Sequence, residues 1–188
     1  MHAGGELHHR GGDSRRRRSH GAQRMSTAAE GPGAEVARED FPFACLFRVR
    51  YSEIDGQQIV FNAHYLTWMD TALAEYLRHL GVVYGEARDG AEPVDFHTVR
   101  NLIDYHAPVR FDEVIAVCCR PGRIGRSSIT FEMAIFARGD AAARATGQVV
   151  WVCAGIGDHA SRPIPEDMRA RFEAAREAAP VEIDPVRV

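Results

Sequence analysis

The stretch RYSEIDGQQIVFNAHYLTWMDTALAEYLRHL, residues 50–80, joins a polar loop to a long amphipathic segment. Its apolar residues recur every three or four positions, at Tyr65, Trp68, Met69, Ala72, Leu73, Tyr76 and Leu80. This period predicts a helix of about five turns with one apolar stripe, and Gly81 is a typical C-terminal stop. Because a helix with a single apolar stripe must bury it, we expect this helix to lie on a sheet.

The segments on either side of this helix have strand character. Before it, Phe47, Val49 and Tyr51 alternate with arginines, which predicts a half-buried strand over residues 47–51. After it come four apolar or alternating segments, at residues 93–107, 114–120, 129–137 and 148–154. A single long helix followed by successive strands predicts an α+β fold, with an antiparallel sheet wrapped around one long central helix.

Turn residues and composition divide the rest of the chain. Pro121-Gly122 with Gly125, and Gly139-Asp140, are expected to form turns between strands, and a short helix is expected from about residue 165 to 178. Residues 1–40 almost lack aliphatic and aromatic side chains, which predicts a disordered basic tail. The folded domain is expected to cover residues 41–180, and residues 181–188 to form a C-terminal tail.

The basic tail leaves two questions open. Four consecutive arginines at residues 15–18 are either solvated or a contact for nucleic acid or anionic lipid. Met25 is a second candidate for the first residue of the protein.

The overall composition is that of a globular protein, with 45% hydrophobic and 26% charged residues and a net charge of −3. That charge argues against nucleic-acid binding by bulk electrostatics. No apolar run approaches the roughly 18 residues that span a bilayer, and no secretory signal is recognisable, so a cytoplasmic protein is predicted. The four cysteines lie in apolar segments without a C-x-x-C pair, and the nine histidines lack ligand spacing, so buried free thiols and no metal are expected.

The polar loop before the helix has the residues that acyl transfer to water requires. Asn62 lies where the helix is expected to begin, and helix N-termini present unpaired N–H groups and a partial positive charge. Asp55 lies seven residues earlier, close enough to face the same point. Backbone donors can stabilise an oxyanion while a carboxylate attacks or activates a water. Spacing alone leaves the role of Asp55 open, because an Asp before a helix is more often a turn or capping residue.

Other catalytic patterns fail. The chain has no G-x-S-x-G nucleophile elbow and no P-loop. Residues 155–160 read G-x-G-x-x-A after a strand, but Pro163 and Pro165 prevent the helix that would bind a pyrophosphate. A strand-ending turn is expected there.

The loop resembles the 4-hydroxybenzoyl-CoA thioesterase-like branch of the hot-dog superfamily, which includes the acyl-CoA thioesterase associated with the Tol–Pal system. That branch has a strand ending in R-[YF]-x-[ED]-x-D, then x-x-G-[IV]-V and a Tyr at the start of the long helix. The matching residues are Arg50, Tyr51, Glu53, Asp55, Ile59, Val60 and Tyr65. Further similarity lies in residues 107–113, 124–132, 147–153 and 162–165, so the resemblance covers about residues 43–176.

The resemblance implies hydrolysis of acyl-CoA thioesters to free acid and CoA. It implies that Asp55 is the catalytic carboxylate and that the Asn62 N–H polarises the thioester carbonyl. It further implies a homodimer or homotetramer with active sites between subunits, and neither a metal nor a redox cofactor. The residues expected to bind the substrate, including the phosphates of CoA, are Tyr65, Arg110, Arg123, Arg126, Ser127 and Ser128.

The sequence departs from the family pattern at Gln58, where the family has Gly. Gly there permits an unusual backbone turn, so either the loop follows another path or Gly56 supplies the flexibility. The Gln58 amide is itself a candidate for contacting the thioester or the water.

Three alternatives remain at this stage. Gln58 in place of Gly keeps open a non-catalytic module that binds acyl-CoA or an acyl carrier. Glu75 on the helix is a second candidate carboxylate, since a separate hot-dog branch uses a helix Glu. A hydratase would require a His paired with a carboxylate, for which His64 is the local candidate.

Overall fold

The computed structural model describes residues 36–82, 85 and 93–184 of the 188-residue chain. They form a six-stranded sheet in the order β2-β5-β4-β3-β1-β6. The strands are β1 (Phe43–Arg48), β2 (Val94–Tyr105), β3 (Val114–Ile124), β4 (Ser128–Ala137), β5 (Ala145–Gly155) and β6 (Val181–Ile183). Neighbouring strands are antiparallel, except that β6 lies parallel to β1.

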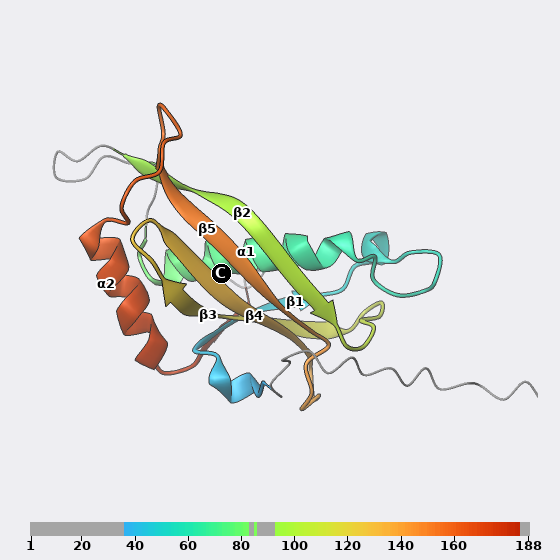
Figure 1. Ribbon diagram of the computed structural model, residues 1–188. Coiled ribbons are helices and arrows are strands. Elements are labelled where there is room, and N and C mark those ends of the chain that lie inside the picture. Colours follow the sequence, from blue (N-terminus) through green and yellow to red (C-terminus); the bar gives the residue numbers. More distant parts are fainter. Residues whose placement is uncertain (1–35, 83–84, 86–92, 185–188) are drawn as a thin grey trace, which may run out of the picture. The chain divides into compact units, whose positions relative to one another are not determined.

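Two α-helices accompany this sheet: α1 (Ala63–His79) and α2 (Glu166–Ala174). Three short 3₁₀ turns complete the order, at Arg38–Asp40, Tyr51–Glu53 and Ala175–Glu177. Figure 1 shows α1 lying across one face of the sheet, with α2 at the opposite end from the loop that precedes α1. The predicted α+β hot-dog architecture is confirmed.

The apolar stripe of α1 forms the centre of the core. Its buried residues are Tyr65, Trp68, Met69, Ala72, Leu73, Tyr76 and Leu77. This is the predicted stripe with Leu77 added, while Leu80 at the end of the helix is only partly buried. Gly81 ends the helix with a φ of +63°, in the left-handed region that glycine adopts without strain.

Alternating residues of the central strands build two separate apolar clusters. On β1, Phe43 and Cys45 pack into the cluster beneath α1, whereas Ala44 belongs to a second cluster with Phe41 and Phe136. Since successive side chains of a strand point to opposite faces, the second cluster lies on the outer face of the sheet. Both faces of β1, β3 and β4 are therefore covered, which explains why these strands are almost uniformly apolar.

The strand predicted over residues 47–51 is wrong in its bounds. β1 covers Phe43–Arg48, and Tyr51–Glu53 form a 3₁₀ turn in which the Tyr51 side chain is 80% exposed. The Glu53 carboxylate accepts the Arg50 N–H at 2.7 Å, and the Glu53 N–H donates to the Arg50 carbonyl at 3.0 Å. These two bonds curl the chain out of the extended conformation that the alternation indicated.

Two further expectations are corrected at β3 and at the C-terminus. Pro121-Gly122 does not turn the chain: both residues lie within β3, at a register irregularity between Pro121 and Ile124. Residues 181–183, expected in a tail, form β6 and pair with Phe43–Cys45 of β1. Residues 1–35 of the predicted basic tail, with the arginine run and Met25, lie outside the described residues, and Arg38–Asp40 form an ordered turn.

Several smaller expectations are confirmed. All four cysteines are free and buried. The chain turns after Gly155, and Gly139 lies in a turn with a φ of +87°. Within the described ranges, no helix has the length and apolar character required to cross a membrane.

Candidate active site

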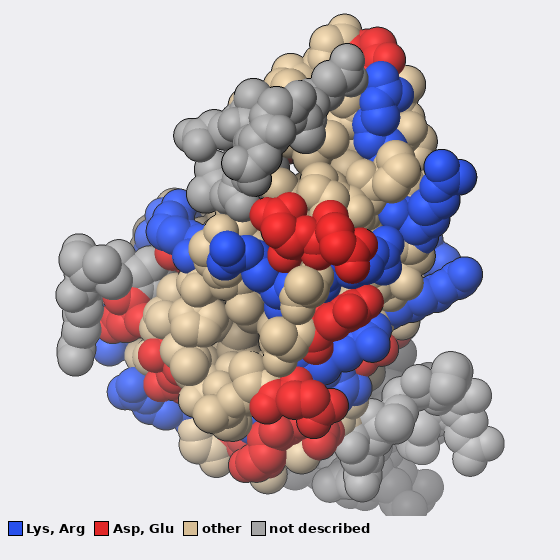
Figure 2. Space-filling model, turned by 90° about the vertical axis from the view of Figure 1, so that its left-hand side faces the viewer, with Lys and Arg blue, Asp and Glu red and all other residues tan. Residues whose placement is uncertain are grey.

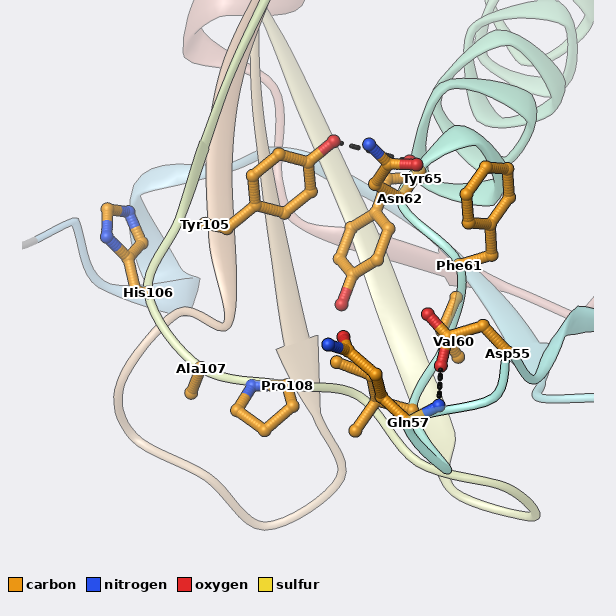
Figure 3. A pocket seen from close by; sticks show the side chains of 11 residues that line it. Asp55, Gln57, Val60, Phe61, Asn62, Tyr65, Tyr105, His106, Ala107 and Pro108 are labelled. Atoms are coloured by element: carbon orange, nitrogen blue, oxygen red, sulfur yellow. Dashed lines mark hydrogen bonds between the residues drawn. The ribbon is translucent and has the colours of Figure 1, made fainter.

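A cleft of about 540 Å³ opens where the loop before α1 meets the end of β2. One wall comes from the loop and the first turn of α1, and the other from the last residue of β2 and the loop after it (Figure 3). The lining residues are Asp55, Gln57, Ile59, Val60, Phe61, Asn62, Tyr65, Tyr105, His106, Ala107 and Pro108. The structure thus brings three of the predicted site residues, Asp55, Asn62 and Tyr65, to one cleft.

Backbone hydrogen bonds hold Asp55 in a closed loop. Its N–H donates to the Ile59 carbonyl at 2.9 Å, and its carbonyl accepts the Gln58 N–H at 3.1 Å. One carboxylate oxygen of Asp55 accepts the Gln57 N–H at 2.7 Å, as Figure 3 shows. The other oxygen has no hydrogen-bond partner among the described residues, so it is free to act on a bound molecule.

The N–H of Asn62 is an unpaired donor immediately before α1, which begins at Ala63. On one side of it, the Val60 N–H donates to Val109 and the Phe61 N–H to Glu53, both at 2.9 Å. On the other side, the His64 N–H donates to the Phe61 carbonyl at 3.0 Å. Within the described residues the Asn62 N–H has no such acceptor, as expected of the first donors of a helix. The helix dipole adds a partial positive charge at this point.

Two tyrosines form the aromatic wall between the two sides of the cleft. The rings of Tyr65 and Tyr105 meet edge to face with centroids 5.0 Å apart. The Tyr105 hydroxyl donates to the Asn62 carbonyl at 3.3 Å, and the Tyr65 hydroxyl accepts the Val109 N–H at 3.3 Å. Burial raises the pKa of both phenols, so both stay protonated at neutral pH.

Glu53, two residues before Asp55, is the charged side chain that the described part of the chain buries, at 2% exposure. Its carboxylate accepts hydrogen bonds from Arg50 and, at 3.1 Å, from Nε1 of Trp68 on α1. Burial alone would raise the pKa of Glu53. The hydrogen bonds from Arg50 and Trp68 outweigh that effect and hold the pKa below its usual value, so the group is ionised at neutral pH.

The remaining predicted site residues lie elsewhere. Gln58 does not line the cleft, and its neighbour Gln57 does. Gln58 itself adopts the left-handed conformation with a φ of +63°, which favours glycine, while Gly56 does not, so Gly56 does not take over the flexible position. Arg110 is exposed on the β2–β3 loop, directly after Val109, whose carbonyl accepts the Val60 N–H.

The other basic and hydroxyl candidates lie at the far end of the sheet. Arg123, Arg126, Ser127 and Ser128 belong to the β3–β4 hairpin. The Ser127 carbonyl accepts the Cys153 N–H near the end of β5, whereas Tyr105 of the cleft pairs with Ala145 at the start of β5. At about 3.3 Å per residue along a strand, the two places are roughly 25 Å apart.

Sequence reasoning missed Gln57, Tyr105 and His106 as cleft residues. Tyr105 and His106 lie at the end of the segment predicted as a strand, and their approach to Asn62 depends on tertiary structure. The second candidate carboxylate, Glu75, forms an ion pair with Arg78 on α1 and does not line the cleft.

The charge distribution on one face and the pKa values of the thiols describe the chemistry available outside the cleft. On the face that carries α2, basic and acidic side chains are interspersed (Figure 2). Burial raises the pKa of Cys45 and of Cys118 to about 12, and also raises the pKa of Cys119 and of Cys153. None of these four thiols is therefore an activated nucleophile in this fold.

Comparison with known proteins identifies the family of this chain. The family model described as "Thioesterase superfamily" matches residues 57–143. The crystal structure of the PA5185 protein from Pseudomonas aeruginosa is 31% identical, with a TM-score of 0.66, and the match covers 76% of this chain and 97% of that protein. The chain belongs to the thioesterase superfamily.

The names of two further relatives in this superfamily state an activity or a bound ligand. The acyl-CoA thioesterase YbgC of Haemophilus influenzae is 25% identical over 71% of this chain and 96% of its own length. A thioesterase from Thermus thermophilus, solved with coenzyme A and zinc, is 27% identical over 73% of this chain and 97% of its own, with a TM-score of 0.61. The association with the Tol–Pal system stays a prediction.

Proposed function

We propose that this thioesterase hydrolyses acyl-CoA thioesters, with Asp55 and the Asn62 N–H as its reacting groups. The observation that carries the proposal is the single cleft in which the free oxygen of Asp55 and an unpaired helix N–H are both presented. The acyl-CoA substrate class rests on the named activity of the Haemophilus relative and on the coenzyme A bound by the Thermus thioesterase.

In this proposal the thioester carbonyl oxygen lies against the Asn62 N–H. As water or a carboxylate attacks, negative charge develops on that oxygen, and the N–H and the dipole of α1 stabilise it. The hydrogen bond from Tyr105 to the Asn62 carbonyl holds the first peptide of the helix in place.

Asp55 has two routes, and the geometry is compatible with both. As a general base it takes a proton from a water whose oxygen bonds to the acyl carbon, and the C–S bond then breaks to release CoA thiolate. As a nucleophile it forms an acyl-aspartyl anhydride with loss of CoA thiolate, and water then cleaves the anhydride. Either route yields free acid and CoA. A thiol such as that of Cys has a pKa near 8.5, so a thiolate leaving group requires no strong acid to leave.

Gln57 replaces Gln58 in the proposed role of an amide that contacts the thioester or the water. Tyr65, whose hydroxyl accepts a bond from Val109, contributes a wall to the acyl site.

The proposed assembly is at least a homodimer with cleft residues from two copies. β2 is an edge strand of the sheet, and it exposes Val99, Leu102 and Tyr105 at 58%, 39% and 51%. Exposed apolar edge strands favour pairing with another strand. Antiparallel pairing of β2 with its two-fold copy would set the start of one strand beside the end of the other. It would thereby bring the β3–β4 hairpin of one copy toward the Asp55 cleft of the other. Arg123 and Arg126 of that hairpin could then bind the phosphates of a CoA in this cleft.

Thiol release from a panel of short, branched, medium-chain and aromatic acyl-CoAs tests the function. Hydrolysis of at least one member by the wild type is expected, together with its loss in Asp55→Ala that retains the wild-type Tm. Binding of acyl-CoA without any thiol release would refute hydrolysis and would favour the non-catalytic module instead.

A further inference from the structure

Glu53 is ionised and almost fully enclosed, at 2% exposure. Burying a charge is costly unless hydrogen bonds compensate for it, and an apolar side chain of similar size is often at least as stable in such a place. Here every oxygen is occupied: Oε2 accepts the Arg50 N–H at 2.7 Å, and Oε1 accepts Nε and Nη2 of Arg50 and Nε1 of Trp68 at 2.8–3.1 Å. These bonds compensate for the buried charge. Because an apolar side chain of similar size is often at least as stable, stability alone does not account for a carboxylate at this position.

The location of Glu53 suggests what its bonds achieve. Its backbone carbonyl accepts the Phe61 N–H at 2.9 Å, so Glu53 closes the base of the loop immediately before Asn62. Its side chain reaches Trp68, a core residue in the second turn of α1. Asp55 follows two residues later, inside the loop. Through Arg50, Phe61 and Trp68, one residue thus connects both ends of the loop and the body of α1.

We infer that Glu53 is a positioning residue, which sets the Asp55 carboxylate relative to the Asn62 N–H by fastening the loop to Trp68. The inference rests on the proposed function, because it takes Asp55 and Asn62 as the reacting groups. Glu53 lies outside the cleft lining and acts only through the loop. Reacting groups must be held closely, since a displacement of about 1 Å can cost on the order of 100-fold in rate.

Two substitutions test this role: Glu53→Gln keeps the size of the side chain, and Trp68→Phe shortens a buried side chain of the core. Glu53→Gln removes the charge and cannot accept all four hydrogen bonds, because half of the amide is a donor. Trp68→Phe leaves Glu53 and Arg50 intact and removes the bond to α1, together with part of the packing of a buried ring. The matched control is Phe136→Leu in the cluster on the outer face of the sheet, which loosens a core that does not touch the loop.

The readouts are kcat, KM, Tm and hydrogen exchange of peptides that cover residues 54–62. We expect kcat to fall roughly 10- to 100-fold in Glu53→Gln and Trp68→Phe with KM within about threefold, since misplacement affects the reacting groups more than substrate binding. Faster exchange of the Asp55 and Phe61 amides should accompany that loss. Phe136→Leu should lower Tm while kcat and the exchange of this segment stay at wild-type values.

Unchanged kcat in both loop variants would overturn the inference. So would a loss of kcat in Phe136→Leu as large as theirs at the same loss of Tm, because the effect would then follow global stability. Asp55→Asn, assayed alongside, separates the two proposals: activity retained there refutes the proposed function. Activity lost there, with full kcat in both loop variants, refutes only the positioning role.

Discussion

The two ends of the sheet provide different kinds of polar group. At the Asp55 end, the carboxylate lies in a loop closed by backbone bonds and fastened to α1 through buried Glu53. At the hairpin end, Arg123 and Arg126 are exposed. A group that attacks a carbonyl must be placed within fractions of an ångström, whereas long cations that bind phosphates can adjust. Under the proposed function, this difference assigns the chemistry to the Asp55 end and the binding of phosphates to the hairpin end.

The largest effect on activity is expected at the Asp55 end of the sheet. Asp55→Asn keeps the size of the side chain and removes its basicity, so kcat should fall about 100- to 10,000-fold, the range of a lost general base. Steady-state thiol release with the best substrate of the panel is the measurement. Asp70→Asn, an exposed carboxylate on α1, is the matched control and should keep wild-type kcat. Equal activity of the two variants would remove Asp55 from the reaction.

The next effect belongs to the hairpin end. Replacing Arg123 and Arg126 together by Ala should raise KM for acyl-CoA about tenfold with little change in kcat, because two phosphate contacts are lost and the reacting groups are untouched. Acyl-pantetheine thioesters lack the nucleotide, so their KM should not change. An equal rise in KM for both substrates would show that these arginines do not recognise the nucleotide.

A smaller effect is expected where the cleft walls meet. Tyr105→Phe removes the hydrogen bond to the Asn62 carbonyl and keeps the ring contact with Tyr65. A hydrogen bond of this kind contributes about 0.5–1.5 kcal/mol, so kcat should drop roughly 2- to 12-fold. The exposed Tyr51→Phe serves as control, and comparable losses in both variants would contradict a local role for Tyr105.

The smallest effect concerns stability of the loop. Gln58 has a φ of +63°, which is strained for a residue with a side chain. Gln58→Gly relieves that strain, but it also raises the conformational entropy of the unfolded chain, which opposes folding. The free energy of unfolding should therefore rise by only about 0.5–1 kcal/mol. Urea denaturation measures it. Gln57→Gly, at a residue without positive φ, should lose stability, and the same sign of change in both variants would contradict the conformational explanation.

The parts of this structure that follow from sequence are those with local periodicity. The stripe of α1 predicted the helix and the core face, and the alternating segments predicted the sheet. Asp55 and Asn62 were expected to lie close together because they are seven residues apart in one continuous loop, and both line the same cleft. Each of these signals is carried by neighbours along the chain.

The parts that were missed depend on contacts between distant residues. Tyr105 reaches Asn62 across 43 positions, and no local pattern marks it. β6 consists of three residues whose strand character comes only from pairing with β1. Tyr51 continued the alternation of β1, but the carboxylate of Glu53 folded that segment into a turn. The choice between Gln57 and Gln58 depends on backbone angles that the two identical side chains do not reveal.

The central claim is that the two ends of the sheet serve one site when they come from two copies. Mixing subunits that carry Asp55→Asn with subunits that carry Arg123→Glu and Arg126→Glu tests it directly. In a mixed dimer one cleft would then receive both defects and the other neither. Because the arginine defect raises KM, activity is measured at an acyl-CoA concentration well below KM, where random exchange between symmetric dimers should restore about a quarter of wild-type activity. Activity equal to the average of the two separate variants would contradict the claim, because each cleft would then draw all its groups from a single chain.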